Sequence, residues 1–266
     1  MSAVLETRAL TRRFNGRLAV DALTLNVECG EIFALLGPNG AGKTTTIKML
    51  TTLLRPSAGS ALVAGFDIVR QAGEVRRAIG YVPQLVSADG MLTGYENLLI
   101  FAKLYDVPRR ERAARVRDAL DFMGLGDAAR RLVSQYSGGM IRRLEIAQSM
   151  LHQPRVLFLD EPTGGLDPIA RNVVWEHLLQ MRVRYGTTVV FTTHLMEEAE
   201  EFCSRLAILH RGRVVANDTP AALKAGIGGV DATLDDVFVH YAGDAPEEGE
   251  GYRETVQQRR TARRLG

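Results

Sequence analysis

The sequence predicts an α/β protein whose core is a mainly parallel β-sheet covered by helices on both faces. Short, continuously apolar runs, which are typical of buried parallel strands, alternate along the chain with stretches of helical spacing. A glycine-rich loop at residues 37–44 also joins one such run directly to a helical stretch. A block of helical pattern from about residue 86 to 152 interrupts the alternation. We therefore expect a helical subdomain inserted in the α/β core.

The N-terminal third contains short β-prone segments separated by turns. Residues 18–27 alternate apolar and polar side chains, which predicts a half-exposed strand. Residues 32–36 are continuously apolar, as in a buried parallel strand, and lead into the glycine-rich loop. A helix over 45–53 is predicted after this loop, and further strands are predicted at 60–64 and 78–82.

The rest of the chain is first helical in pattern and then returns to the sheet. Apolar residues fall at helical spacing over 97–105 and 109–123, and a third helix is predicted at 141–151. Beyond Pro154, strands and helices alternate again. The predicted strands are 156–159, 188–192 and 206–209, and the predicted helices are 169–184 and 195–202.

Composition and charge exclude several classes of protein. The chain has 33 basic and 31 acidic residues, so it lacks the overall basic field with which many proteins capture nucleic acid. Cys29 and Cys203 are far apart, which excludes a disulfide scaffold or a cysteine zinc site and fits a reducing compartment. No apolar run approaches the ~18–20 residues that cross a bilayer, and the first residues lack a signal peptide's apolar stretch. We expect a cytoplasmic protein that acts at a membrane only through a partner.

The glycine-rich loop has the Gly-x4-Gly-Lys-Thr pattern of a phosphate-binding loop. Its glycines let backbone amides and the N-terminus of the next helix face a polyphosphate. Lys43 is expected to hold the β- and γ-phosphates and Thr44 to ligate Mg²⁺; the alternative is a glycine-rich turn with a surface lysine. The residues expected to bind nucleotide here are Gly37, Pro38, Asn39, Gly40, Ala41, Gly42, Lys43, Thr44 and Thr45.

Two carboxylates follow the apolar run at 156–159. A buried parallel strand places its C-terminal residues at the sheet edge where α/β proteins bind ligands, so Asp160 would hold Mg²⁺ through water. Glu161, one residue further, could polarise an attacking water. Taken alone, the pair fits acids at a helix start better. Beside a phosphate loop, it favours nucleotide hydrolysis.

A second anion-binding feature lies upstream of these carboxylates. Ser137, Gly138 and Gly139 precede a predicted helix, whose N-terminal amides attract negative charge. In this order the motifs closely resemble the ATP-binding cassette (ABC) family, from about residue 4 to 241. The matching motifs are the phosphate loop, Gln84, the signature at 136–140, Asp160 with Glu161, Gly165-Leu166-Asp167, and His194.

The resemblance implies a P-loop NTPase of the ABC ATPase type, with an N-terminal antiparallel β subdomain and the inserted helical subdomain. It implies one nucleotide-binding domain over 1–242, followed by an acidic and then basic extension over 243–266. It also implies ATP and Mg²⁺ as ligands and a head-to-tail dimer of two copies. In that dimer, each ATP lies between the phosphate loop of one copy and the signature of the other.

The resemblance implies a role for each motif residue. Glu161 would be the general base, and His194 would contact the γ-phosphate. Lys43 would take part in catalysis as well as binding. The residues implied to hold Mg²⁺ are Thr44, Gln84 and Asp160, with Gln84 also contacting the attacking water. The remaining implied nucleotide contacts are Phe14 on the adenine, Ser137, Gly138 and Gly139 on the γ-phosphate of the other copy, and Asp167 across the dimer interface.

Two features of the signature depart from the usual family pattern. Tyr136 replaces the usual leucine, and Met140 replaces the glutamine of many members. The Ser-Gly-Gly-Met form is similar to ATPases of drug- and antibiotic-resistance exporters, and so are residues 92–98 and 233–239. We therefore expect an exporter ATPase of the daunorubicin-resistance type that works with a separate transmembrane permease on the cytoplasmic face of the cell membrane.

Several alternatives remain open from the sequence. The chain could be the ATPase of an importer, although importers usually have glutamine at the position of Met140. It could also be a soluble ABC protein acting on ribosomes or nucleic acid through the arginine tail at 259–264. That tail, like the arginine-rich segment 109–117, could be a solvated surface or a contact with lipid headgroups or a partner. Nothing in the sequence identifies the cargo.

Overall fold

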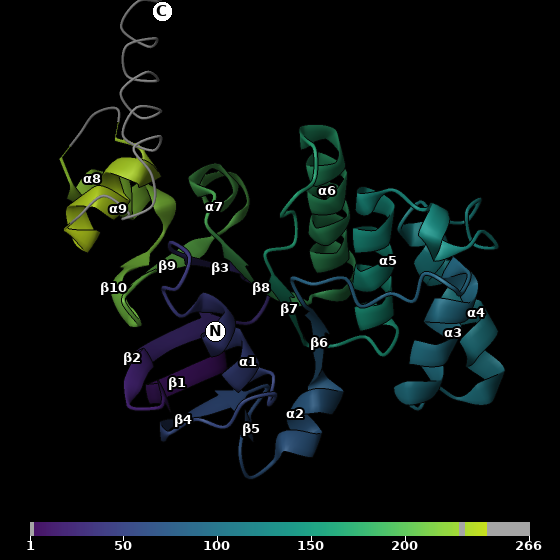
Figure 1. The fold of residues 1–266 in the computed structure, drawn as a ribbon, viewed down its shortest axis with the longest axis horizontal. Coiled ribbons are helices and arrows are strands. Elements are labelled where there is room, and N and C mark those ends of the chain that lie inside the picture. Colours follow the sequence, from purple (N-terminus) through teal and green to yellow (C-terminus); the bar gives the residue numbers. More distant parts are fainter. Residues whose placement is uncertain (1–2, 229–231, 244–266) are drawn as a thin grey trace, which may run out of the picture.

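The structure is a computed structural model that describes residues 3–228 and 232–243. Its centre is a six-stranded sheet in the order β10-β9-β3-β8-β7-β6, in which only β10 runs antiparallel to its neighbour (Figure 1). The strands, in that order, are Arg213–Asp218, Arg205–His210, Ile32–Leu36, Thr188–Thr193, Val156–Asp160 and Ile79–Val82. Every residue of β3, β7 and β8 is buried, as expected for central strands covered on both faces.

The N-terminal strands form most of a second, antiparallel sheet, whose strand order is β2-β1-β4-β5. These strands are Arg17–Glu28, Ala3–Phe14, Ala58–Val63 and Phe66–Asp67. Helix α1 (Lys43–Leu50) shares one hydrophobic cluster with this sheet and with Phe33 and Leu35 of β3. Since successive side chains of a strand point to opposite faces, β3 contributes Ile32, Ala34 and Leu36 to the other cluster. The antiparallel β subdomain is thus present.

Helices cover the opposite face of the central sheet and form the subdomain beside it (Figure 1). Buried aromatic residues of α6 and α9, Trp175 and Phe238, pack in the same cluster as Ile32 and Leu36 of β3. The helical subdomain consists of α3 (Gly94–Leu104), α4 (Arg109–Phe122), a 3₁₀ turn (Val133–Gln135) and α5 (Gly138–Met150). The other helices are α2 (Ala72–Ala78), α6 (Pro168–Tyr185), α7 (Met196–Phe202), α8 (Pro220–Gly226) and α9 (Leu234–Ala242). In the described ranges, no helix combines the length and apolar character of a membrane span.

The predicted core strands are confirmed, and the helix bounds near the motifs need correction. Helix α1 begins at Lys43, within the glycine-rich loop and two residues earlier than expected, and it ends at Leu50, because Thr52 adopts a left-handed φ of 64°. Helix α5 begins at Gly138, three residues earlier than expected, because Ser137 caps it. Helix α2 was not predicted, since Val75 is its one buried side chain and its apolar periodicity is weak. The arginine tail lies outside the described residues.

The packing of α5 on β6 generates a stability prediction. A Cβ added at Gly80 of β6 would lie 2.5 Å from the backbone oxygen of Ser149 and 2.9 Å from Leu157. Gly80→Ala is therefore expected to lower the free energy of unfolding by about 1–3 kcal/mol through overpacking. Gly73→Ala is the matched control, because this exposed residue of α2 has open space around it. The control should be neutral or stabilising by about 1 kcal/mol or less in urea denaturation. Equal unfolding midpoints for the two variants would contradict the close contact between α5 and β6.

Candidate functional site

The glycine-rich loop lies where β3 meets α1, and close packing restricts its shape. Gly42 adopts a φ of 106°, and a Cβ there would approach the backbone oxygen of Ala19 to 2.6 Å. At Gly37 a Cβ would lie 2.3 Å from the backbone oxygen of Leu209. Both glycines are thus needed for the loop to pass between β2 and β9. The predicted strand–loop–helix unit is present, with its backbone at the sheet edge.

Lys43 lies buried inside this loop. Its Nζ donates to the carbonyl oxygens of Gly37 at 2.7 Å and Pro38 at 3.1 Å, and lies 3.7 Å from Glu161 Oε1. The side chain is only 5% exposed. This burial lowers the pKa of Lys43, and the nearby Glu161 and Asp160 carboxylates partly oppose that shift. The ammonium group is therefore held at the point where the loop and the carboxylates meet.

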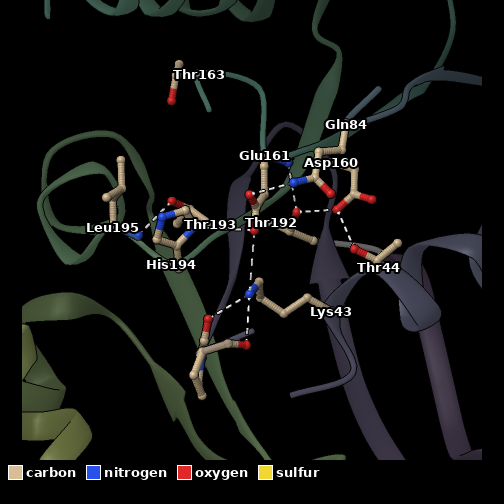
Figure 2. Close-up of polar contacts among 12 residues, drawn as sticks. Lys43, Thr44, Gln84, Asp160, Glu161, Thr163, Thr192, Thr193, His194 and Leu195 are labelled. Atoms are coloured by element: carbon tan, nitrogen blue, oxygen red, sulfur yellow. Dashed lines mark hydrogen bonds and ion pairs between the residues drawn. The ribbon is translucent and has the colours of Figure 1, made fainter. Parts of the chain in front are cut away.

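Asp160 ends β7 and accepts hydrogen bonds from two neighbouring elements. Its Oδ1 accepts from the Thr44 hydroxyl of α1 at 3.0 Å and from the Thr192 hydroxyl of β8 at 2.6 Å (Figure 2). Thr192 also accepts from the backbone N–H of Glu161 at 2.9 Å. Since β8 lies between β3 and β7, parallel pairing brings the three strand ends to one edge. Thr192 is thus a shared hydrogen-bond partner of both carboxylate residues.

Glu161 is surrounded by polar side chains from three separate segments. Its Oε2 accepts from the Gln84 side-chain amide at 3.1 Å, and its Oε1 lies 3.3 Å from His194 Nδ1 (Figure 2). The hydrogen bond with His194, followed by the charges of His194 and Lys43, lowers the pKa of Glu161. The same hydrogen bond raises the pKa of His194. Glu161 also has a left-handed φ of 48°, an uncommon conformation for a residue other than glycine.

The residues at Asp160 fit a magnesium ion. Thr44 and Asp160 supply a hydroxyl and a carboxylate oxygen, which are the hard ligands that Mg²⁺ prefers. In the described part of the chain, no group of three or more His, Cys, Asp and Glu side chains could hold a metal. At nucleotide sites Mg²⁺ usually has one or two protein ligands, and phosphate oxygens and water complete its coordination.

The other side chains predicted for the site, those of Ser137, Asp167 and Phe14, have contacts away from the phosphate loop. Ser137 caps α5 by accepting from Met140 N at 3.3 Å, and Asp167 caps α6 by accepting from Ala170 N at 2.9 Å. Phe14 ends β1, where the Arg12 guanidinium lies 4.5 Å from its ring. Within the described ranges, no hydrogen bond or ion pair joins these side chains to the phosphate loop. Gly138 and Gly139 pack near Leu166 and Ala170, so the signature faces the start of α6.

Tyr136, the unusual first residue of the signature, is accommodated by burial and one hydrogen bond. The ring is buried, and its hydroxyl donates to the Ala128 backbone oxygen at 2.7 Å. Burial raises the pKa of this phenol. Replacing the usual leucine by tyrosine therefore adds an anchor within the helical subdomain and leaves Ser137 as the cap of α5.

The buried polar residues that support the site belong to none of the motifs that the sequence shows. Glu198 of α7 accepts from the hydroxyls of Thr163 and Thr193 and from the Trp175 indole. Arg142 of α5 donates to backbone oxygens near Gln84 and Glu161. In the sequence these residues stand among other charged residues on helices, a pattern that indicates a solvated surface. No local signal separates them from their exposed neighbours.

A P-loop nucleoside triphosphatase is defined by a glycine-rich loop with a lysine between a strand and a helix, and by a carboxylate from another strand of the same sheet. This protein has the loop and Lys43 between β3 and α1, and Asp160 at the end of β7. A family model described as "ABC transporter" matches residues 20–164. The chain belongs to the ABC transporter family.

Relatives of known name agree with this assignment. The chain is 47% identical to the "Daunorubicin/doxorubicin resistance ATP-binding protein DrrA" of Streptomyces peucetius, over 84% of this chain and 68% of that protein. It is 44% identical to the "Nod factor export ATP-binding protein I" of Burkholderia thailandensis, over 83% of this chain and 72% of that protein. A solved ATP-binding subunit of an ABC transporter superposes with a TM-score of 0.80 at 30% identity, covering 90% of this chain and 99% of that chain.

The shared role of Thr192 can be tested by substitution. Thr192 is fully buried, so Thr192→Val removes the hydroxyl, leaves the shape, and leaves Asp160 and the Glu161 N–H each short of a partner. We expect a loss of about 1–3 kcal/mol in the free energy of unfolding. Thr192→Ser retains the hydroxyl and should cost about 1 kcal/mol from the lost methyl group. Urea denaturation of both variants checks the order; a valine variant as stable as the serine variant would contradict it.

Proposed function

We propose that this chain is the ATP-hydrolysing subunit of a membrane exporter and that a separate permease subunit forms the transport path. The observation that carries the catalytic part of the proposal is the arrangement of Lys43, Gln84 and His194 around the Glu161 carboxylate. A phosphate loop alone binds nucleotide. A carboxylate held at the same sheet edge by a cation, an amide and an imidazole adds the groups that hydrolysis requires.

Each of these residues has a distinct task in the proposed reaction. In this proposal Lys43 and the loop amides hold the β- and γ-phosphates, and Thr44, Asp160 and Gln84 would hold Mg²⁺. The ion, when bound, neutralises charge on the phosphate oxygens. Glu161 orients the attacking water and accepts its proton. A glutamate carboxylate is ionised at neutral pH, and the neighbours of Glu161 lower its pKa further. His194 donates a hydrogen bond to the γ-phosphate, where negative charge develops.

The second part of the proposal is a head-to-tail dimer of two copies. Ser137 and the N-terminus of α5 form an anion-binding feature. In the described residues, no hydrogen bond joins this feature to the phosphate loop of the same chain. In the dimer, Ser137, Gly138 and Gly139 of one copy contact the ATP held by the loop of the other copy, with Asp167 at the interface and Phe14 against the adenine. ATP then stabilises the closed dimer, because the closed state offers more contacts to the nucleotide than the open state does.

Export and location are inferred from the named relatives. The two relatives described above are a resistance protein and an export protein, and both are named as ATP-binding proteins. By similarity, this chain binds a permease at the cytoplasmic face of the membrane. The arginine tail on which the ribosome-associated alternative rests lies outside the described residues.

Substitution of Glu161 tests the catalytic assignment. Glu161→Gln retains the shape of the side chain and removes the proton acceptor, so hydrolysis of ATP should fall by about 100-fold or more. Binding of Mg-ATP should persist, since Lys43 and the loop are unchanged. Glu176→Gln, at an exposed position of α6, is the control for the charge change and should retain full turnover. Steady-state phosphate release measures both variants; unchanged turnover in Glu161→Gln would exclude Glu161 as the base.

The dimer is tested in the slowly hydrolysing background. The Glu161→Gln variant should become dimeric in size-exclusion chromatography on addition of Mg-ATP. Adding Ser137→Arg, which places a bulky cation at the start of α5, should prevent that dimer while each monomer still binds ATP through its own loop. Persistence of the ATP-dependent dimer in the double variant would contradict the proposed contact between Ser137 and the nucleotide of the other copy.

A further inference from the structure

Arg142 of α5 is buried next to the proposed catalytic residues, and its guanidinium donates to backbone oxygens of the two segments that contain Gln84 and Glu161. The side chain is 8% exposed. Its guanidinium donates to the backbone oxygen of Pro83 at 2.7 Å, of Gln84 at 3.3 Å and of Glu161 at 3.3 Å. Gln84 and Glu161 are also joined by their side chains, because the Gln84 amide donates to the Glu161 carboxylate at 3.1 Å. Arg142 therefore binds the backbones of the same two residues.

Glu145 holds Arg142 and the segment after Gln84 together. Its Oε2 accepts from Arg142 Nη1 at 3.1 Å, and its Oε1 accepts from the backbone N–H and the hydroxyl of Ser87. Glu145 is 3% exposed, so the two charges neutralise each other away from water. One residue pair on α5 thus binds the segment 83–87 at both ends.

Burying the Arg142 guanidinium is costly unless acceptors and opposite charges surround it. Burial lowers the pKa of Arg142, and the Glu145 and Asp160 carboxylates oppose the shift. An arginine fork that donates to carbonyls of two segments fixes their distance and orientation more closely than a single hydrogen bond does. Glu161 has the left-handed φ described above, and a hydrogen bond to its carbonyl oxygen helps to hold that backbone conformation.

We infer that Arg142, anchored by Glu145, is a positioning residue for ATP hydrolysis that holds Gln84 and Glu161 in their mutual geometry. This inference rests on the proposed function. Arg142 touches neither nucleotide nor water in this role; it acts through the backbone carbonyls of the two residues. Loss of the guanidinium would allow Gln84 and Glu161 to separate, while the phosphate loop and its contacts to nucleotide would remain.

The first test compares matched arginine substitutions on α5. Arg142→Gln in the full chain should lower the kcat for ATP hydrolysis about tenfold or more and leave the KM for ATP within about threefold, as expected for misplaced catalytic groups. Arg142→Lys should recover part of the kcat, because an ammonium can still donate to one or two of the carbonyls. Arg143→Gln is the control: Arg143 donates to the Met123 backbone oxygen, outside the site, and its loss should leave kcat within about twofold.

A purely structural role for Arg142 would give a different result. Equal losses of kcat in Arg142→Gln and Arg143→Gln, or a loss of kcat matched by the fraction of unfolded protein in thermal denaturation, would overturn the inference. So would a large rise in KM with kcat unchanged. Absence of ATP hydrolysis in the unmodified chain would overturn the proposed function itself. Hydrolysis that depends on Glu161 but not on Arg142 would overturn the positioning role alone.

A double-mutant cycle with Gln84 provides the second test. If Arg142 acts through Gln84, the effects of Gln84→Ala and Arg142→Gln on kcat should overlap, since both remove the same interaction. The decrease in log kcat caused by Arg142→Gln should then be smaller in the Gln84→Ala background, at less than about half of the decrease measured in the unmodified chain. Effects that multiply fully would show that Arg142 acts independently of Gln84 and would overturn the inference.

Discussion

The burial of the Lys43 ammonium is the constraint on which the rest of the site depends. A charge removed from water is costly unless opposite charges and hydrogen-bond acceptors surround it. The loop carbonyls of Gly37 and Pro38 supply acceptors, and Glu161 and Asp160 supply negative charge. That arrangement requires strand β7 to end beside the loop that follows β3. The strand order β3-β8-β7 provides this, with one intervening strand whose Thr192 bridges the two carboxylate residues.

Buried charge elsewhere in the protein follows the same rule. In the described ranges, the buried charged side chains lie at the sheet edge around Lys43 or on the helices beside it. They are Lys43, Arg142, Glu145, Asp160 and Glu198. The remainder of the core is apolar or contains neutral polar groups. Since each buried charge needs several partners, the network extends outward from the sheet edge into α5 and α7. The chain thus concentrates its desolvated charges where the proposed chemistry takes place.

The parts of the site that could be predicted from sequence are those formed by neighbouring residues. The loop from Gly37 to Thr44 and the end of β7 at Asp160 each combine a motif with an adjacent apolar strand, and their juxtaposition follows from parallel topology. The contacts of Arg142 with Pro83 and of Glu198 with Thr163 span 59 and 35 residues. Helical periodicity places both residues among charged neighbours, so only the tertiary structure distinguishes them. The motif resemblance located Gln84 and His194, whose side chains have no local pattern that indicates a shared partner.

Helix α5 has two functions in the proposed mechanism, and they are mechanically linked. Its first turn is capped by Ser137, which in the proposed dimer meets the nucleotide of the other copy. Arg142 lies one to two turns further along the same helix and binds the backbones of Gln84 and Glu161. A helix transmits displacement along its axis with little internal change, because its hydrogen bonds fix successive turns. A shift of α5 on dimer closure would therefore move Arg142 together with Ser137. The geometry of the hydrolytic pair in one site would then depend on whether the signature of the same chain has engaged the other site.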